Sequence, residues 1–130
     1  MFKNDFLMRE IENFSKFVIK LFRQENIEFE TDQEHENSID EDLLFYRFQE
    51  MVYAGKINEA ENALFELIEK EPKLGYLQLT EKFYSEVVKM SDEYLQRHHY
   101  SREEIFESLD QIEQIYEEKY SDSADGIGKK

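Results

Sequence analysis

Apolar residues recur at intervals of three and four along almost the whole chain, which is the spacing that gathers them on one face of an α-helix. Strand-like alternation is absent, and helix-breaking residues are few, with one proline and four glycines among 130 residues. The sequence therefore predicts an all-α fold, a compact bundle of five to six helices. Because a chain of this length can close one hydrophobic core unaided, we expect residues 1–120 to form a single helical domain.

The chain is strongly acidic, with 31 Asp and Glu against 16 Lys and Arg and a net charge of −15. A surface of this sign repels phosphate backbones, so we expect no nucleic-acid partner. Cysteine is absent, no apolar run reaches the roughly 20 residues that span a bilayer, and acidic residues interrupt the apolar N-terminus. We therefore expect a cytoplasmic protein without a secretory signal or a membrane partner.

The first helix is expected from about Asp5 to Arg23. Residues 1–23 contain five basic and three acidic side chains, so this segment is slightly basic in an acidic chain. Its apolar stripe consists of Leu7, Ile11, Phe14, Val18 and Leu21. Further apolar residues flank the stripe, so the helix should lie between two neighbours or share one side with another chain. Candidate interaction residues on that side are Phe17, Ile19 and Phe22. A membrane-surface helix is the alternative, which the negative net charge disfavours.

Residues 24–42 contain nine acidic residues and neither lysine nor arginine. Such a run is typical of a solvated segment, and we expect residues 24–38 to form an acidic linker after the first helix. A calcium-binding loop is the alternative, but the central glycine and alternating ligands of an EF-hand are missing. Residues 121–130 carry no apolar period and are expected to be a disordered tail.

Two helices joined by a tight turn are expected next. The first runs from about Ile39 to Tyr53 and is closed by Gly55, which can adopt the left-handed conformation. The second begins with Asn58 as its N-cap, has Glu61 in capping-box register, and stops before Pro72.

This run, at about residues 40–70, resembles a single tetratricopeptide repeat. The residues that carry the resemblance are Gly55, Ala60 and Pro72. Phe48 stands where that repeat has a small residue, and no second copy of the motif follows. We therefore expect one tetratricopeptide-like hairpin within a closed bundle rather than a repeat array. Candidate residues for a groove beside the hairpin are Tyr46, Arg47 and Tyr53.

Three more helices are expected in the second half of the chain. One starts near Gly75 and carries two adjacent apolar lanes, so it should be the most buried helix. Ser91 is the expected N-cap of a short helix that ends near Arg97. Ser101 and Glu104 form a capping box for the last helix. Its single stripe, typical of an outer helix, consists of Ile105, Leu109, Ile112 and Tyr116.

Four segments resemble, in order and at similar spacing, a family of short, uncharacterised bacterial proteins of unknown function. These segments are DFLMREIENF, GKINEAENALFELIE, FYSEVVKMSDEYL and YSREEIFESLDQI. The acidic stretch 30–38 and the tail lie outside the resemblance. It implies a bacterial, cytosolic helical protein and brings no catalytic residues.

No constellation of residues points to catalysis. The pair His98–His99 is the first place to look for a metal, but neighbouring helical residues point about 100° apart, and histidine suits a helix C-terminus without a further role. The sequence contains no nucleophile elbow and no glycine-rich phosphate loop. We expect no enzyme activity, no cofactor and no metal.

The leading hypothesis is a non-enzymatic protein-interaction module that binds a helix or peptide beside the hairpin, or a homodimer through the N-terminal helix. The alternative is an acidic mimic of nucleic acid that occupies a basic protein's binding site. This alternative is motivated by charge. Residues 1–23 have a net charge of +2 and the whole chain one of −15, so the residues after position 23 have a net charge of −17. The mimic requires carboxylates gathered on one face.

Overall fold

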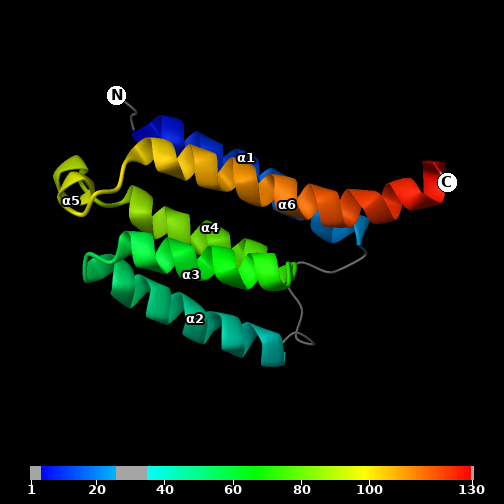
Figure 1. The fold of residues 1–130 in the computed structure, drawn as a ribbon, viewed down its shortest axis with the longest axis horizontal. Coiled ribbons are helices and arrows are strands. Elements are labelled where there is room, and N and C mark those ends of the chain that lie inside the picture. The colour runs from blue at the N-terminus through cyan, green and yellow to red at the C-terminus, as the bar shows by residue number, and fades with distance from the viewer. Residues whose placement is uncertain (1–3, 26–34, 130) are drawn as a thin grey trace.

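The computed structural model describes residues 4–25 and 35–129, with side chains for residues 5–25 and 41–120. This part of the chain contains six helices and no strand, which confirms the predicted all-α fold (Figure 1). The helices are α1 (Asn4–Gln24), α2 (His35–Tyr53), α3 (Ile57–Lys70), α4 (Gly75–Val88), α5 (Asp92–Arg97) and α6 (Arg102–Lys129).

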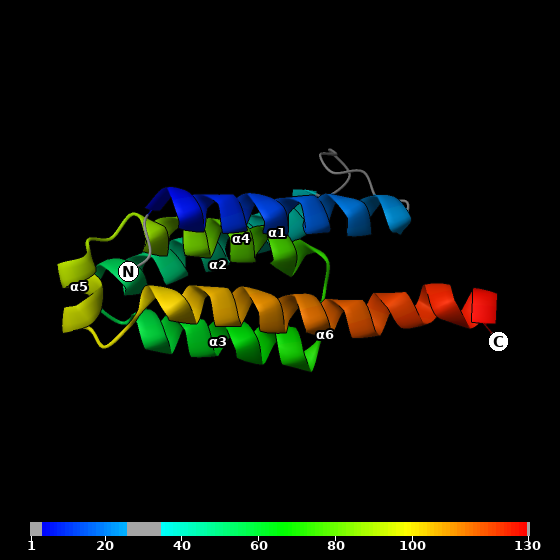
Figure 2. The ribbon, with the colours of Figure 1, turned by 90° about the horizontal axis from the view of Figure 1, so that it is seen from above.

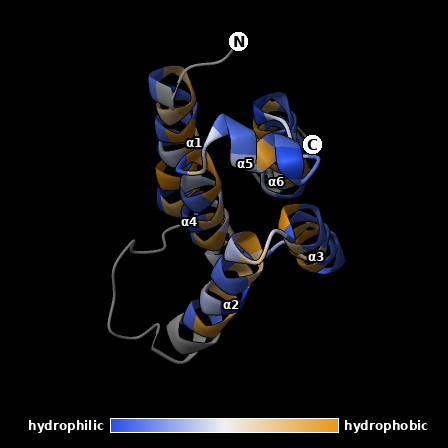
Figure 3. Ribbon diagram, turned by 90° about the vertical axis from the view of Figure 1, so that its left-hand side faces the viewer, coloured by the Kyte–Doolittle hydropathy of each residue, from blue (hydrophilic) through white to orange (hydrophobic). Residues whose placement is uncertain are grey.

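The five long helices form two layers. Helices α1, α4 and α2 lie in one layer with α4 in the middle, and α6 and α3 form the other (Figures 2 and 3). The layers also touch at both sides, because α1 contacts α6 and α2 contacts α3. Within the described parts of the chain, none of the helices has the length and apolarity to cross a bilayer.

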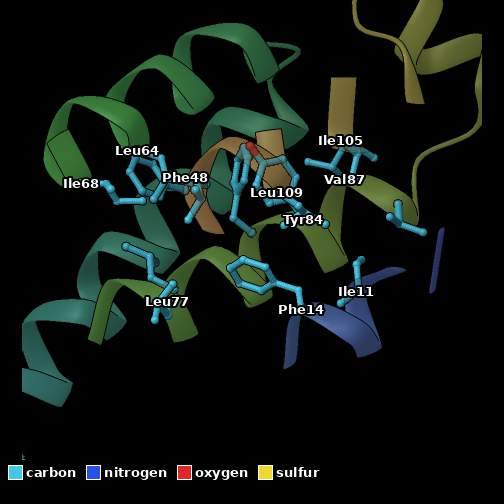
Figure 4. Close-up of a cluster of buried hydrophobic side chains, with 14 of the residues drawn as sticks. Ile11, Phe14, Phe48, Leu64, Ile68, Leu77, Tyr84, Val87, Ile105 and Leu109 are labelled. Carbon is cyan, nitrogen blue, oxygen red and sulfur yellow. The ribbon is translucent and has the colours of Figure 1, made fainter. Parts of the chain in front are cut away.

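The hydrophobic core lies between the layers and draws side chains from all five long helices (Figure 4). The predicted stripes of the first and last helices are buried throughout. Helix α4 buries eight of its fourteen residues and α3 buries five of fourteen, as expected for the central position of α4. Phe48 is also buried, and its ring packs edge-on against Phe83 of α4 with centroids 5.9 Å apart.

Several predicted helix ends are confirmed. The Ser91 side chain accepts a hydrogen bond from the Tyr94 backbone N–H at 3.0 Å, and the short helix α5 ends at Arg97. At the start of α6, the Ser101 N–H donates to the Glu104 carboxyl at 2.9 Å, which is one half of the predicted capping box.

The predicted start of α3 is wrong. Lys56, rather than Asn58, occupies the N-cap position, and no side chain caps the helix. The Asn58 amide instead donates to the backbone carbonyls of His98 and His99, at 3.3 and 3.1 Å. Glu61 turns into the core rather than back toward the helix start. Tertiary partners therefore outcompete local capping for both side chains.

The predicted acidic linker is partly helical. Helix α1 extends through Gln24 and α2 begins at His35, so both ends of residues 24–38 belong to helices, while residues 26–34 lie outside the described residues. The earlier start of α2 has a physical reason: this stretch contains no proline or glycine, and acidic residues are favourable near a helix N-terminus.

The backbone of α6 is helical to Lys129, past the point at residue 120 where the domain was expected to end. No proline interrupts this stretch. Disorder of residues 121–130 stays a prediction, and their side chains lie outside the described residues.

The turn between α2 and α3 depends on Gly55, whose φ of +81° is the left-handed conformation predicted for it. A β-carbon at this position would come within 2.4 Å of the His98 ring. The Tyr94 hydroxyl donates to the Val52 carbonyl at 2.6 Å and fixes α5 to the end of α2. Helix α5 thus closes one end of the bundle over the hairpin turn.

Candidate functional site

The structure divides the six predicted interaction residues between two separate helices, α1 and α2, which flank α4 on opposite sides (Figure 3). On α1, Phe22 is only 5% exposed and belongs to the core, Phe17 is partly buried against it, and Ile19 is 36% exposed. On α2, all three predicted residues are exposed. The two sets therefore do not form one surface.

The outward side of α2 carries a row of large exposed side chains, which we call the α2 outer face. It consists of Leu43, Tyr46, Arg47 and Tyr53. Leu43, Tyr46 and Tyr53 are 63%, 62% and 56% exposed, and Arg47 is exposed as well. Sequence reasoning found three of the four but missed Leu43. Its spacing of three residues from Tyr46 was the available signal.

Two residues of this face have defined polar character. The Tyr53 hydroxyl donates to the Glu86 carboxyl at 2.9 Å, and this hydrogen bond raises the pKa of Tyr53. Arg47 is the only lysine or arginine in α2 and forms no ion pair with any described residue. The face therefore combines apolar area, one held tyrosine and one arginine that has no ion pair with a described residue.

A second surface lies on the last turns of α1, where Lys16, Ile19, Lys20 and Arg23 line a shallow hollow. We call these four residues the α1 basic patch. Within residues 5–25 and 41–120, none of its three cations forms an ion pair. The sequence showed five basic side chains within residues 1–23 but not that three of them share one surface.

A third surface is the α1–α6 groove, an open depression of about 520 Å³ between these helices. Its lining consists of Glu10, Asn13, Phe106, Glu107, Leu109, Asp110 and Glu113. No cation lines it. The pKa of Glu113 is raised, first by burial and then by the negative charges of Glu117, Asp110 and Glu10. Like charges therefore crowd one another across this groove.

The most unusual polar arrangement is buried inside the bundle and centres on Glu61 of α3, which is 8% exposed. One of its carboxyl oxygens, Oε2, accepts hydrogen bonds from Tyr84 of α4 at 2.6 Å, from Tyr100 at 2.8 Å and from Ser108 of α6 at 2.6 Å. We call these four residues the Glu61 cluster. It ties both layers of the bundle together at one atom.

The geometry of the Glu61 cluster fits a structural role. Burial is the main cause that raises the pKa of Tyr84 and of Tyr100, so both hydroxyls stay protonated donors. All three hydroxyls point to the same oxygen, and neither described surface hollow is lined by a member of the cluster. Sequence reasoning missed this role, although Glu61 follows Ile57 by four residues and precedes Leu64 by three on the buried stripe of α3.

Glu81 of α4 is a second partly buried acid, at the side of α4 that faces α1. Its Oε2 atom is buried and has no hydrogen-bond partner in the described structure. Burial raises the pKa of Glu81, and the Ser15 hydroxyl offsets part of this effect. The carboxyl group is therefore easier to protonate than an exposed one.

The adjacent histidines lie where α5 ends, and their predicted structural role stays a prediction. The His98 ring lies against Gly55 and 4.5 Å from the Tyr94 ring, while His99 is exposed and adopts a φ of +62°. Among the described residues, no three His, Cys, Asp or Glu side chains are grouped so as to hold a metal ion.

Comparison with known proteins gives a family but no function. No curated protein and no solved structure matches the chain. A family model matches residues 1–117, a range that runs through the acidic stretch 30–38 and stops before the tail. The expected membership of an uncharacterised family is thereby confirmed: the chain belongs to the family of unknown function DUF6483.

Proposed function

We propose that this protein is a non-enzymatic protein-interaction module and that the α2 outer face is its binding surface. The observation that carries the proposal is the row of Leu43, Tyr46, Arg47 and Tyr53, large side chains left exposed on a helix whose other side is packed on α4. Tyrosine and arginine are the residue types that dominate binding energy at protein interfaces. A cytoplasmic, bacterial setting belongs to the proposal and rests on the cysteine-free sequence and the family resemblance.

The chemistry of this face specifies the kind of partner. Leu43, Tyr46 and Tyr53 offer apolar area at helical spacing, which suits an amphipathic helix laid along α2. Arg47 has no ion-pair partner among the described residues, so the partner should bring a carboxylate to it. Tyr53 is held by Glu86, so little side-chain freedom would be lost there on binding.

The acidic-mimic alternative finds less support. It requires carboxylates gathered on one face, whereas exposed acidic side chains occur on α1, α2, α3, α5 and α6. Representative exposed positions are Glu12, Glu50, Glu66, Glu93 and Glu117. Apart from the four carboxyl groups of the α1–α6 groove, this distribution spreads the negative charge around the bundle rather than along one face.

The experiment that tests the proposal is comparative affinity capture from cells that produce the protein. The baits are the wild-type chain, the Tyr46→Ala/Arg47→Glu variant, and a Glu66→Ala control altered on an exposed position of α3. We expect a partner retained by the wild type and the control and lost from the double variant. An identical set of partners on all three baits, or none on any, would contradict the proposal.

A further inference from the structure

Two surfaces of opposite charge share α1. The α1 basic patch has three cations without an ion pair in the described structure, and the α1–α6 groove gathers four carboxyl groups without a cation. In a chain of net charge −15, three cations on one surface without an ion pair to any described residue are unexpected. The spacing of the charged residues along α1 and α6 allows the cations of one copy to face the carboxyl groups of a second copy.

The register of the groove follows from the packing of its two helices. Helices α1 and α6 run in the same direction (Figure 2) and are in contact, and the rings of Phe6 and Phe106 lie 5.1 Å apart. A residue of α1 therefore lies near the α6 residue about 100 positions later. This register places Glu10 of α1 near Asp110 of α6. The carboxyl groups of Glu107, Asp110 and Glu113 are three residues apart on α6, so they follow one another at successive turns along the groove.

The cations of the α1 basic patch have a similar spacing along their helix. Lys16, Lys20 and Arg23 are separated by four and three residues, or about 6 and 4.5 Å along a helix axis. The carboxyl groups of the groove are separated by three and three residues, about 4.5 Å each. If α1 of a second copy lay antiparallel to α6 in the groove, its Arg23, Lys20 and Lys16 would meet the three α6 carboxyl groups one after another.

We propose that two copies of this chain associate about a two-fold axis, each laying the second half of its α1 antiparallel in the α1–α6 groove of the other. In this arrangement Arg23 faces Glu107, Lys20 faces Asp110 and Lys16 faces Glu113 of the other copy. Because a two-fold interface is self-complementary, the same contacts form twice and the assembly closes as a dimer.

The groove itself favours this occupant. Its lining includes Phe106 and the largely buried Leu109, which offer apolar area to the exposed Ile19 of the second copy. Glu10, Glu107, Asp110 and Glu113 line the groove together, and burial first and then the charges of Glu117, Asp110 and Glu10 raise the pKa of Glu113. Cations placed between these carboxyl groups would offset their like charge. The second copy supplies those cations at a similar spacing.

This inference does not depend on the proposed binding function. The dimer uses α1 and α6 and leaves the α2 outer face open, since α2 lies on the far side of α4 from α1 (Figure 3). Failure of self-association would therefore leave the partner-binding proposal intact, and loss of the partner would leave the dimer intact.

The test is sedimentation of charge-reversal variants of the full chain. We expect the wild type to form dimers at low salt and to dissociate at about 1 M salt, where the Debye length falls to about 3 Å. Lys20→Glu and Asp110→Lys should each weaken the homodimer by at least about tenfold. Mixing the two variants should restore association, because every Lys20–Asp110 contact between unlike copies then joins opposite charges.

Matched controls distinguish the loss of the specific Lys20–Asp110 contact from the effect of a changed net charge. Lys56→Glu and Glu66→Lys make the same charge changes at exposed positions outside both surfaces and should leave the dimer unchanged. Arg23→Glu provides a second reversal should Lys20→Glu fold poorly, as judged by circular dichroism. A monomeric wild type at low salt, or a dimer that both reversals leave intact, would overturn the proposal. Binding of an added basic peptide by a monomeric wild type would assign the groove to a foreign partner and overturn it equally.

Discussion

At the scale of single residues, the Glu61 cluster joins α3, α4 and α6 through one buried oxygen atom. A carboxyl group is costly to bury unless its hydrogen bonds are satisfied. Here Tyr84, Tyr100 and Ser108 all donate to one oxygen atom. Sequence reasoning gave Glu61 a capping role, because a glutamate three residues after an asparagine fits that local pattern. The tertiary partners lie 23 to 47 residues away, and a local pattern contains no information about them.

Tyr100→Phe tests the energetic weight of this cluster. The variant keeps the ring in the core and removes one of the three donors to Glu61, so we expect a loss of about 1–2 kcal/mol in the free energy of unfolding. Urea denaturation followed by circular dichroism measures it. Tyr46→Phe removes an exposed hydroxyl and should change the stability by less than about 0.5 kcal/mol. Equal effects of the two substitutions would show that the cluster adds nothing beyond burial.

Gly55→Ala tests the turn between α2 and α3. The positive φ would cost an alanine about 1–2 kcal/mol, and its β-carbon would meet the His98 ring. We therefore expect a lower thermal midpoint for Gly55→Ala. The loss should be smaller when measured in a His98→Ala background, since the contact with the ring is then absent. If the cost is the same in both backgrounds, the contact between His98 and the turn has no energetic effect.

At the scale of elements, sequence periodicity predicted the helices and the buried stripes, but not every boundary. The stripes of α1 and α6 are correct because a long amphipathic pattern has one compatible packing direction. The predicted start of α2, at about Ile39, is four residues too late, and the predicted N-cap of α3, Asn58, is wrong. An acidic run carries no apolar period from which to locate a helix start, and Asn58 binds carbonyl groups of a distant segment.

The contact between α1 and α4 should depend on pH through Glu81. Its pKa is raised above the ordinary value of 4.5 in the folded chain, so its contribution to stability is fully present below that value. The contribution is lost as the pH rises through the folded pKa. Glu81→Gln should therefore match the wild type near pH 4 and be more stable than the wild type at about pH 8. Urea titrations at both pH values measure the difference.

The control for that experiment is Glu66→Gln, which neutralises an exposed carboxyl group on α3. It should show no comparable divergence from the wild type between the two pH values. A stability difference for Glu81→Gln that is independent of pH would contradict the assignment of the raised pKa to burial of this group.

The α2 outer face should contribute little to folding. Tyr46 and Arg47 are exposed, and no polar contact of Arg47 with a described residue is present. We expect Tyr46→Ala/Arg47→Glu to change the free energy of unfolding by less than about 0.5 kcal/mol per substitution. Thermal denaturation of the purified variant measures this. A large destabilisation would mean that the face is part of the fold and that lost binding reports misfolding.

At the scale of the whole molecule, the sequence predicted the fold class and the high burial of α4. It could not predict that the candidate residues of α1 and α2 lie apart. Phe22 and Ile19 are three positions apart on the same amphipathic helix, and the tertiary packing of α1 buries the first and leaves the second exposed. Surfaces that two helices build together, such as the α1–α6 groove, require the tertiary arrangement.

The most direct measurement of the central claim, that the α2 outer face binds a protein partner, is site-specific photo-crosslinking in living cells. A photoreactive amino acid replaces Tyr46 in one protein and the exposed Glu66 of α3 in another. We predict a discrete crosslinked product from position 46 that is absent from position 66 and is lost when Arg47→Glu is added. No product from position 46, or the same products from both positions, would contradict the claim.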